Sequence, residues 1–202
     1  MTPGRYIVLE GSEGCGKSTH AARLGAELGA VVTRETGGTG IGKLIRNVLH
    51  DPSHTHLEAK AEALLIAADR AQHMAEVVGP ALAAGRHVVS DRSVYSSLAY
   101  QSYGRGLPYD VVSSVNDWAL DGHWPELVLL LDVPNEQLAT RMQRRELDRF
   151  ERESAEFHDR VRAGFLEMAA KDPERWVLVD ANRSHSDVAA AIRTAVRERL
   201  GL

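Results

Sequence analysis

The stretch from Gly11 to Ser18 reads G-x-x-x-x-G-K-S, and it separates a short apolar run, residues 6–10, from a helical pattern at residues 17–28. Glycines in such a segment let backbone N–H groups curl around a phosphate. The lysine then reaches the β- and γ-phosphates, and the serine hydroxyl is placed for Mg²⁺. The helix that follows points its N-terminus at the anion. The segment therefore predicts a nucleoside triphosphate site with Mg²⁺, formed by Gly11, Ser12, Glu13, Gly14, Cys15, Gly16, Lys17, Ser18 and Thr19.

Apolar runs alternate with helical patterns along the whole chain. The runs are rich in Val, Ile and Leu and mostly continuous, as in strands buried on both faces. Such alternation implies an α/β fold, with a parallel sheet between two layers of helices. The expected strands are residues 6–10, 31–35, 87–91, 127–133 and 176–181. The expected helices are residues 17–28, 41–49, 57–78, 93–102, 109–120, 135–146, 154–170 and 186–200.

The length and composition restrict the class of protein further. A chain of 202 residues fits a single domain, residues 1–202, with room for a small inserted lid. The net charge of -4 argues against general nucleic-acid binding and against a basic membrane face. We find no signal peptide and no segment near the roughly 18 apolar residues of a membrane span. The single cysteine fits a reducing compartment, so we expect a cytoplasmic protein that binds neither nucleic acid nor membrane.

Charged residues gather where the expected strands end. Glu10, Arg34 and Asp91 each stand at or beside the carboxyl end of a strand, which is where parallel sheets bind ligands. Asp91 follows the third strand and is placed to organise Mg²⁺ together with Ser18. Arg92, the next residue, could hold an acceptor.

The remaining motifs favour a kinase among the proteins that use this phosphate loop. A GTPase would carry D-x-x-G and N-K-x-D, and neither pattern occurs in the chain. Transport and motor ATPases are normally longer. The segment 141–152 is rich in arginine interleaved with acids, which fits either a solvated helix face or a lid. A lid would close over the transferring phosphate, stabilise its charge and exclude water.

A series of segments, in order and with intact spacing, resembles a known family. Besides the phosphate loop, they are RETGGT (34–39), AADRAQH (67–73), SDRSVYSSLAYQ (90–101), YGRGL (103–107), LLLDV (129–133) and RRELDRFE (144–151). Together they are similar to the bacterial thymidylate kinases, which are P-loop nucleoside monophosphate kinases. The resemblance implies a three-layer P-loop NTPase fold with a five-stranded parallel sheet and a small arginine-rich lid. It also implies a homodimer and transfer of the γ-phosphate of ATP to dTMP.

The resemblance implies roles for single residues as well. Glu13 would bind the dTMP 3′-hydroxyl, Arg92 would hold its phosphate, and Tyr100 would crowd C2′ and so select deoxyribose. Arg70 would meet the thymine edge, and the segment 141–152 would form the lid. The implied dTMP site contains Glu13, Arg34, Ile66, Arg70, Arg92, Ser97, Tyr100 and Gln101. The implied metal site contains Ser18 and Asp91, and the implied catalytic residues are Lys17, Arg92, Arg145 and Arg149.

The chain departs from the family pattern at two positions. Thr36 stands where the family usually has proline, and Ile66 stands where it usually has a phenylalanine that stacks on thymine. A kinase for another nucleoside monophosphate or small phosphorylated acceptor therefore remains an alternative. A nucleotide-binding regulator without transferase activity is a second alternative, from a different class.

Three further expectations concern the reactivity of Cys15 in the phosphate loop, the helix at residues 57–78 and the tryptophans. Cys15 precedes a helix N-terminus and lies beside Lys17, two features that lower a thiol pKa, so it is either a reactive thiol or a buried, inert one. The helix at residues 57–78, with Leu57, Ala61, Leu64 and Leu65, could present a dimer face or pack into the core. The tryptophans are expected in the core: Trp118, Trp124 and Trp176.

Overall fold

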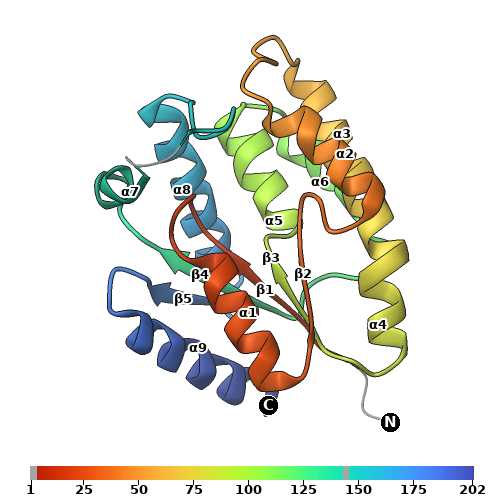
Figure 1. Ribbon diagram of the computed structural model, residues 1–202, viewed down its shortest axis with the longest axis vertical. Helices are drawn as coiled ribbons and strands as arrows, with labels where there is room; N and C mark the ends of the chain where they lie inside the picture. The colour runs from red at the N-terminus through yellow and green to blue at the C-terminus, as the bar shows by residue number, and fades with distance from the viewer. Residues whose placement is uncertain (1–3, 143–145) are drawn as a thin grey trace.

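In the part of the chain that this computed structural model describes, residues 4–142 and 146–202, five parallel strands form one sheet (Figure 1). Their order across the sheet is β2-β3-β1-β4-β5. The prediction of five strands is confirmed, and each end lies within one residue of the expected position. The strands are β1 (Tyr6–Glu10), β2 (Val31–Arg34), β3 (Val88–Asp91), β4 (Leu127–Asp132) and β5 (Trp176–Asp180).

Helices cover both faces of this sheet, as the alternation predicts (Figure 1). Helices α1 and α9 pack on one face, and helices that include α3, α5, α6 and α8 pack on the other. The helical segments are α1 (Lys17–Leu28), α2 (Gly40–His50), α3 (Ala59–His73), α4 (Gly79–Ala83), α5 (Val94–Ser97), α6 (Tyr109–Leu120), α7 (Asn135–Met142), α8 (Ala155–Lys171) and α9 (His185–Leu200), with π-helical segments η1 (Met74–Val78) and η2 (Leu98–Gly104).

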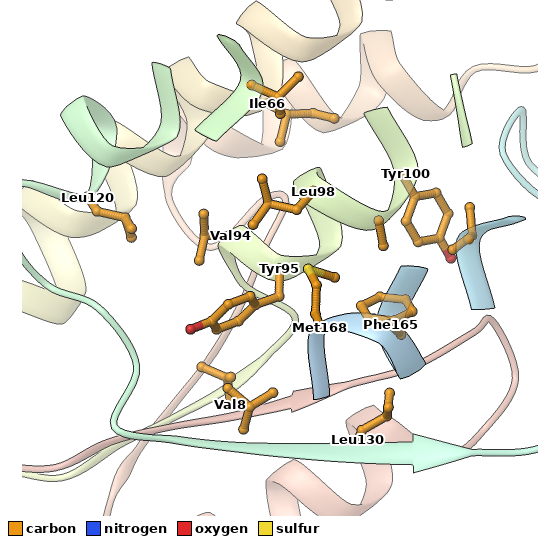
Figure 2. Packing of buried hydrophobic residues seen from close by; sticks show 14 of the residues in the cluster. Val8, Ile66, Val94, Tyr95, Leu98, Tyr100, Leu120, Leu130, Phe165 and Met168 are labelled. Atoms are coloured by element: carbon orange, nitrogen blue, oxygen red, sulfur yellow. The ribbon is translucent and has the colours of Figure 1, made fainter. Parts of the chain in front are cut away.

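Successive residues of the central strand β1 point to opposite faces, and both faces are buried. Ile7 and Leu9 face α1 and α9, whereas Tyr6 and Val8 face the larger core on the other side. In Figure 2 this second core is built from Val8 and Leu130 below, with aromatic and aliphatic side chains of α5, η2 and α8 above them. The continuous apolar runs of the sequence thus have the cause expected for central strands.

Several expected boundaries differ in the structure. Helix α3 continues through η1 into α4, a helix that the sequence did not predict; Pro80 lies in its first turn, where proline is tolerated. The helix expected at 135–146 is described only to Met142, as α7. The later part of the expected lid, residues 146–152, is a loop and turn.

The expectation that every tryptophan lies in the core is wrong for Trp118, whose exposed fraction is 87%. Trp118 lies on the outward side of α6, a helix whose inner side carries Val112, Asn116 and Leu120. Trp124 and Trp176 instead pack against Tyr95, with ring centroids 5.9 and 4.7 Å from it. None of the helices in the described ranges combines the length and apolar character that crossing a membrane requires.

The loop after β2 is held by side chains of α3 and by the start of α2. The backbone N–H of Gly37 donates to Asp69 Oδ1 at 2.9 Å, and Gly42 N–H donates to the capping hydroxyl of Thr39 at 2.9 Å. A Cβ added at Gly42 would lie 2.3 Å from Asp69 Oδ1. The absence of a side chain at position 42 thus allows Asp69 to reach the loop.

We expect Gly42→Ala to destabilise the protein by about 1–3 kcal/mol, because the added methyl group overpacks this contact. Gly40→Ala is the matched control, since it lies in the same helix and its Cβ would meet nothing within 4 Å. Urea denaturation of both variants measures the difference. Equal free energies of unfolding would show that Asp69 moves aside without cost.

Candidate active site

A cleft of about 390 Å³ opens at the carboxyl ends of β1, β2 and β3. Its walls come from the phosphate loop, the residues that follow β2 and β3, the inner side of α3, the α5–η2 helix and the turn at 148–151. Lys17, Ser18 and Asp91 line it together with every residue expected at the acceptor site: Glu13, Arg34, Ile66, Arg70, Arg92, Ser97, Tyr100 and Gln101. The expected triphosphate and acceptor sites therefore share one cavity.

The phosphate loop is folded around its own lysine. Lys17 Nζ donates to the carbonyl oxygen of Ser12 at 2.7 Å and lies 3.6 Å from Cys15 Sγ. Gly16, which caps α1, has a φ of 97°, a left-handed conformation that favours glycine. The loop thus turns directly into the helix N-terminus, as anion binding requires.

Ser18 and Asp91 meet at the mouth of this loop. The Ser18 hydroxyl donates a hydrogen bond to Asp91 Oδ2, although the two residues lie on α1 and β3. A hydroxyl and a carboxylate are hard oxygen ligands of the kind that Mg²⁺ prefers. The two residues therefore fit the expected metal site.

Arg92 is surrounded by polar partners in the floor of the cleft. Its Nη2 donates to Glu13 Oε1 at 2.5 Å and to the Tyr100 hydroxyl at 3.1 Å, and its Nη1 donates to Ser96 at 2.8 Å. Burial opposes ionisation of Glu13, but Arg92, Lys17 and other nearby cations outweigh it and lower the pKa of Glu13 to about 2. Arg92 has a φ of 72°, which is uncommon outside glycine and is concentrated at functional sites.

Arg46 also lines the cleft, and the sequence did not predict it as a site residue. Its Nη1 donates to the carbonyl oxygen of Thr36 at 3.2 Å. Burial, and then the positive charge of Arg34, lower the pKa of Arg46. Two cations that disfavour each other in a cavity favour an anion between them. Arg46 lies in the middle of α2 rather than at a strand end, so the pattern that revealed the other residues gave no signal for it.

Arg70 is 1% exposed and its guanidinium is fully engaged by the protein. Nε and Nη2 bind Glu35 at 2.9 and 2.8 Å. Nη1 donates to Ser97 at 2.9 Å and to Asn116, and Nη2 also donates to the carbonyl of Ser93 at 3.0 Å. Arg70 therefore shapes the wall through its neighbours, whereas its contact with a base stays a prediction.

The turn at 148–151 closes one side of the cleft. Asp148 Oδ2 binds His50 Nδ1 at 2.7 Å, and the Phe150 ring packs edge-on against the His50 ring at 5.2 Å. Arg149 is buried below this turn, where Nη2 binds Glu62 at 2.6 Å and Nε binds the carbonyl of Leu49 at 2.8 Å. Its catalytic role stays a prediction, and Arg145 lies outside the described residues.

A family model for thymidylate kinase matches residues 9–192 of the chain. The chain belongs to the thymidylate kinase family. The resemblance read from the sequence, and with it the P-loop α/β fold, is thus confirmed.

Individual thymidylate kinases match over nearly their whole length. One from Trichlorobacter lovleyi is 46% identical over 98% of this chain and 99% of that protein. One from Chromobacterium violaceum is 48% identical over 94% of this chain and 92% of that protein. The crystal structure of thymidylate kinase from Ehrlichia chaffeensis superposes with a TM-score of 0.80 at 28% identity, and covers 96% of this chain and 100% of that one.

Cys15 is 3% exposed and packs beneath the loop, in the core formed with α1 and α9. We therefore expect iodoacetamide to leave the native protein unmodified, while the urea-unfolded chain reacts at its single cysteine. Burial hinders attack more than the neighbouring Lys17 favours it. Intact-protein mass spectrometry decides the point, and a carboxymethyl adduct on the native protein would restore the reactive-thiol hypothesis.

Proposed function

We propose that this member of the thymidylate kinase family transfers the γ-phosphate of ATP to dTMP, giving ADP and dTDP. One observation carries the proposal: the phosphate loop and the full set of expected acceptor residues line the same cleft. The family membership and the near full-length relatives support the same reaction.

For this phosphoryl transfer, the protein needs mainly to position the two phosphate groups and to neutralise their charge. The acceptor is a phosphate monoester, whose second pKa is about 6, so at neutral pH it is already a nucleophile and needs no general base. Lys17 contacts the donor phosphates, and Arg92, Arg34 and Arg46 surround the acceptor phosphate, so that the two groups approach without mutual repulsion. Ser18 and Asp91 would hold Mg²⁺, which would supply further charge neutralisation on the donor phosphates.

The sugar of the acceptor lies against Glu13 and Tyr100. The Tyr100 hydroxyl is 3.1 Å from Arg92 Nη2 and 3.4 Å from Glu13 Oε1, which fixes its ring in the floor of the cleft. A ring held in this way has no room to retreat from a 2′-hydroxyl. This arrangement supports selection of deoxyribose over ribose.

A second candidate function, a kinase for an acceptor other than dTMP, depends on which base the cleft binds. Ile66 lines the cleft where the family usually has phenylalanine, and it offers apolar contact without a flat π surface. An acceptor screen with dTMP, dUMP, dCMP, UMP and AMP tests the proposal directly. A preference for an acceptor other than dTMP would support the alternative kinase. Binding of Mg-ATP without formation of any diphosphate would support the regulator.

We expect Lys17→Ala and Arg92→Ala to abolish most transfer while the fold survives. Each removes a charge-assisted contact to phosphate, worth about 1.5–3 kcal/mol, or roughly a tenfold to hundredfold loss of kcat/KM. Lys17→Ala should act mainly on the use of ATP, and Arg92→Ala on the use of dTMP. Steady-state kinetics with each substrate varied in turn separates them. Near-normal kcat/KM in either variant, with unchanged melting, would refute the assignment.

We also propose that the protein is a cytoplasmic homodimer that binds no nucleic acid. Helix α3 packs between α2 and α6, and these three helices carry exposed apolar side chains on their outer sides. They are Ile41, Leu44, Val48, Leu64, Val111 and Trp118. A surface of this kind marks a protein–protein interface, and burial against a second copy accounts for the exposure of Trp118.

We expect Leu64→Glu to convert the dimer to a monomer, because it places a charge in the middle of this apolar surface. Leu178→Glu is the matched control, since Leu178 has similar exposure, 56% against 59%, but lies on the edge strand β5. Sedimentation velocity reports the mass of each species. A Leu64→Glu variant that stays dimeric would place the interface elsewhere.

A further inference from the structure

Glu62 is a buried carboxylate on α3 that joins three separate parts of the acceptor wall. Its side chain is 0% exposed. It accepts hydrogen bonds from Gln101 Nε2 at 2.8 Å, from Arg105 at 3.0 and 3.2 Å, and from Arg149 Nη2 at 2.6 Å. All of these partners are N–H donors, so the carboxylate of Glu62 acts here only as an acceptor.

This contact fixes the orientation of the Gln101 amide. Because Glu62 only accepts, Gln101 must turn its NH₂ group toward α3, and its carbonyl oxygen points the other way. Gln101 Oε1 is buried and has no partner within residues 4–142 and 146–202. Gln101 also forms part of the cleft wall. A buried acceptor without a donor is unfavourable, so the wall holds a hydrogen-bond acceptor that awaits a ligand.

Ser97, four residues earlier on the same α5–η2 helix, offers a hydrogen-bond donor instead of an acceptor. Its Oγ accepts a hydrogen bond from Arg70 Nη1 at 2.9 Å. Arg70 cannot accept one, so the hydroxyl proton of Ser97 is free to be donated to another group. The wall thus presents a donor at Ser97 beside an acceptor at Gln101.

Ser97 as a hydrogen-bond donor and Gln101 as an acceptor match the edge of one kind of pyrimidine base. When its C4 carbonyl lies opposite Ser97 and its N3–H opposite Gln101, a 4-oxo pyrimidine such as thymine satisfies both groups. A 4-amino pyrimidine such as cytosine offers an amino group and an unprotonated N3, so its N3 would face the oxygen of Gln101 with no proton between them. Sites built to bind an N–H strongly reject analogues that lack it.

We propose that Glu62 is the positioning residue that sets base specificity, since it holds Gln101 with Oε1 toward N3–H of the acceptor base. Glu62 itself touches no substrate and acts through Gln101. The inference rests on the proposed function, because it assumes a pyrimidine nucleotide in this cleft. It assigns the choice between 4-oxo and 4-amino bases to a buried charge on the far side of the wall.

The test compares Glu62→Gln with wild type, using dTMP and 5-methyl-dCMP as acceptors. These nucleotides share the sugar, phosphate and methyl group, and differ only at C4 and N3. A glutamine at position 62 can donate or accept, so it no longer dictates how the Gln101 amide lies. We expect the ratio of kcat/KM for dTMP over 5-methyl-dCMP to fall by about tenfold or more, with use of 5-methyl-dCMP rising.

Glu153→Gln is the matched control. Glu153 binds Arg105 Nη1 at 2.5 Å, so this variant removes a carboxylate from the same ion-pair network without touching Gln101. We expect its acceptor ratio to equal that of wild type. An unchanged ratio in a folded Glu62→Gln variant, or an equal fall in both variants, would overturn the proposal.

Gln101→Leu keeps the proposal testable if Glu62→Gln does not fold. It removes the acceptor oxygen and leaves Glu62 with both arginines, so the same fall in the ratio is expected, and an unchanged ratio would contradict it. The activity of the wild-type protein separates failure of the proposed function from failure of the inference about Glu62. If wild type phosphorylates neither nucleotide, the proposed function fails and this inference falls with it; if wild type uses dTMP and the variants keep its preference, only the inference fails.

Discussion

The buried ion pair between Arg70 and Glu35 joins the parts of the chain that form the acceptor cleft. Glu35 follows β2 and also binds His73 Nδ1 at 2.9 Å, while Arg70 extends from α3 to the start of α5 and to α6. Burial opposes the charge of Glu35, but Arg70 and His73 outweigh it, so the pKa of Glu35 is lowered. Loss of one partner from such a pair leaves an uncompensated buried charge, which typically costs about 3–5 kcal/mol. This buried ion pair thus fixes the relative positions of the segments that line the cleft.

The two ends of the cleft use charge differently. At the end of the cleft where we propose that the base binds, Arg70 and Glu62 are each neutralised by protein partners, so the proposed contacts with the base come from neutral side chains. At the phosphate end, Arg34 and Arg46 disfavour each other, and Arg92 shares its charge with Glu13. We therefore expect a dianionic phosphate to bind at the cationic end, and the hydrogen-bond pattern rather than net charge to select the base at the other end.

Sequence patterns could identify the residues that lie at strand ends or in the phosphate loop, because β and α periods place these reliably. They located Lys17, Ser18, Asp91 and Arg92, which the fold brings together. They missed Arg46 and the ion-pair network around Glu62, since the significance of a charge in a helix depends on partners far away in the chain. Glu62 and Arg149 are separated by 87 residues and meet only after folding.

The AADRAQH segment illustrates the same limit within one motif. Its resemblance to the family drew attention to Arg70 as a base-contacting residue. In the folded chain, Asp69 and His73 serve the same loop as Arg70, by binding Gly37 and Glu35. The motif thus reads as an anchor for the segment after β2, a function that its composition alone does not reveal. Trp118 was misplaced for a related reason: an apolar residue favours burial, but the sequence does not show whether the fold of its own chain provides it.

Helix α3 carries Glu62, Ile66 and Arg70 on its inner side, at intervals of four residues, and Leu64 on its outer side. A helix advances by about 100° per residue, so an inserted or deleted residue near position 60 would turn every later side chain of α3 by that angle. Side chains that now lie on the surface would then point into the cleft, and the buried charges of Glu62 and Arg70 would point toward the surface. Relatives of this chain can therefore vary in length in the loop before α3 far more easily than within it.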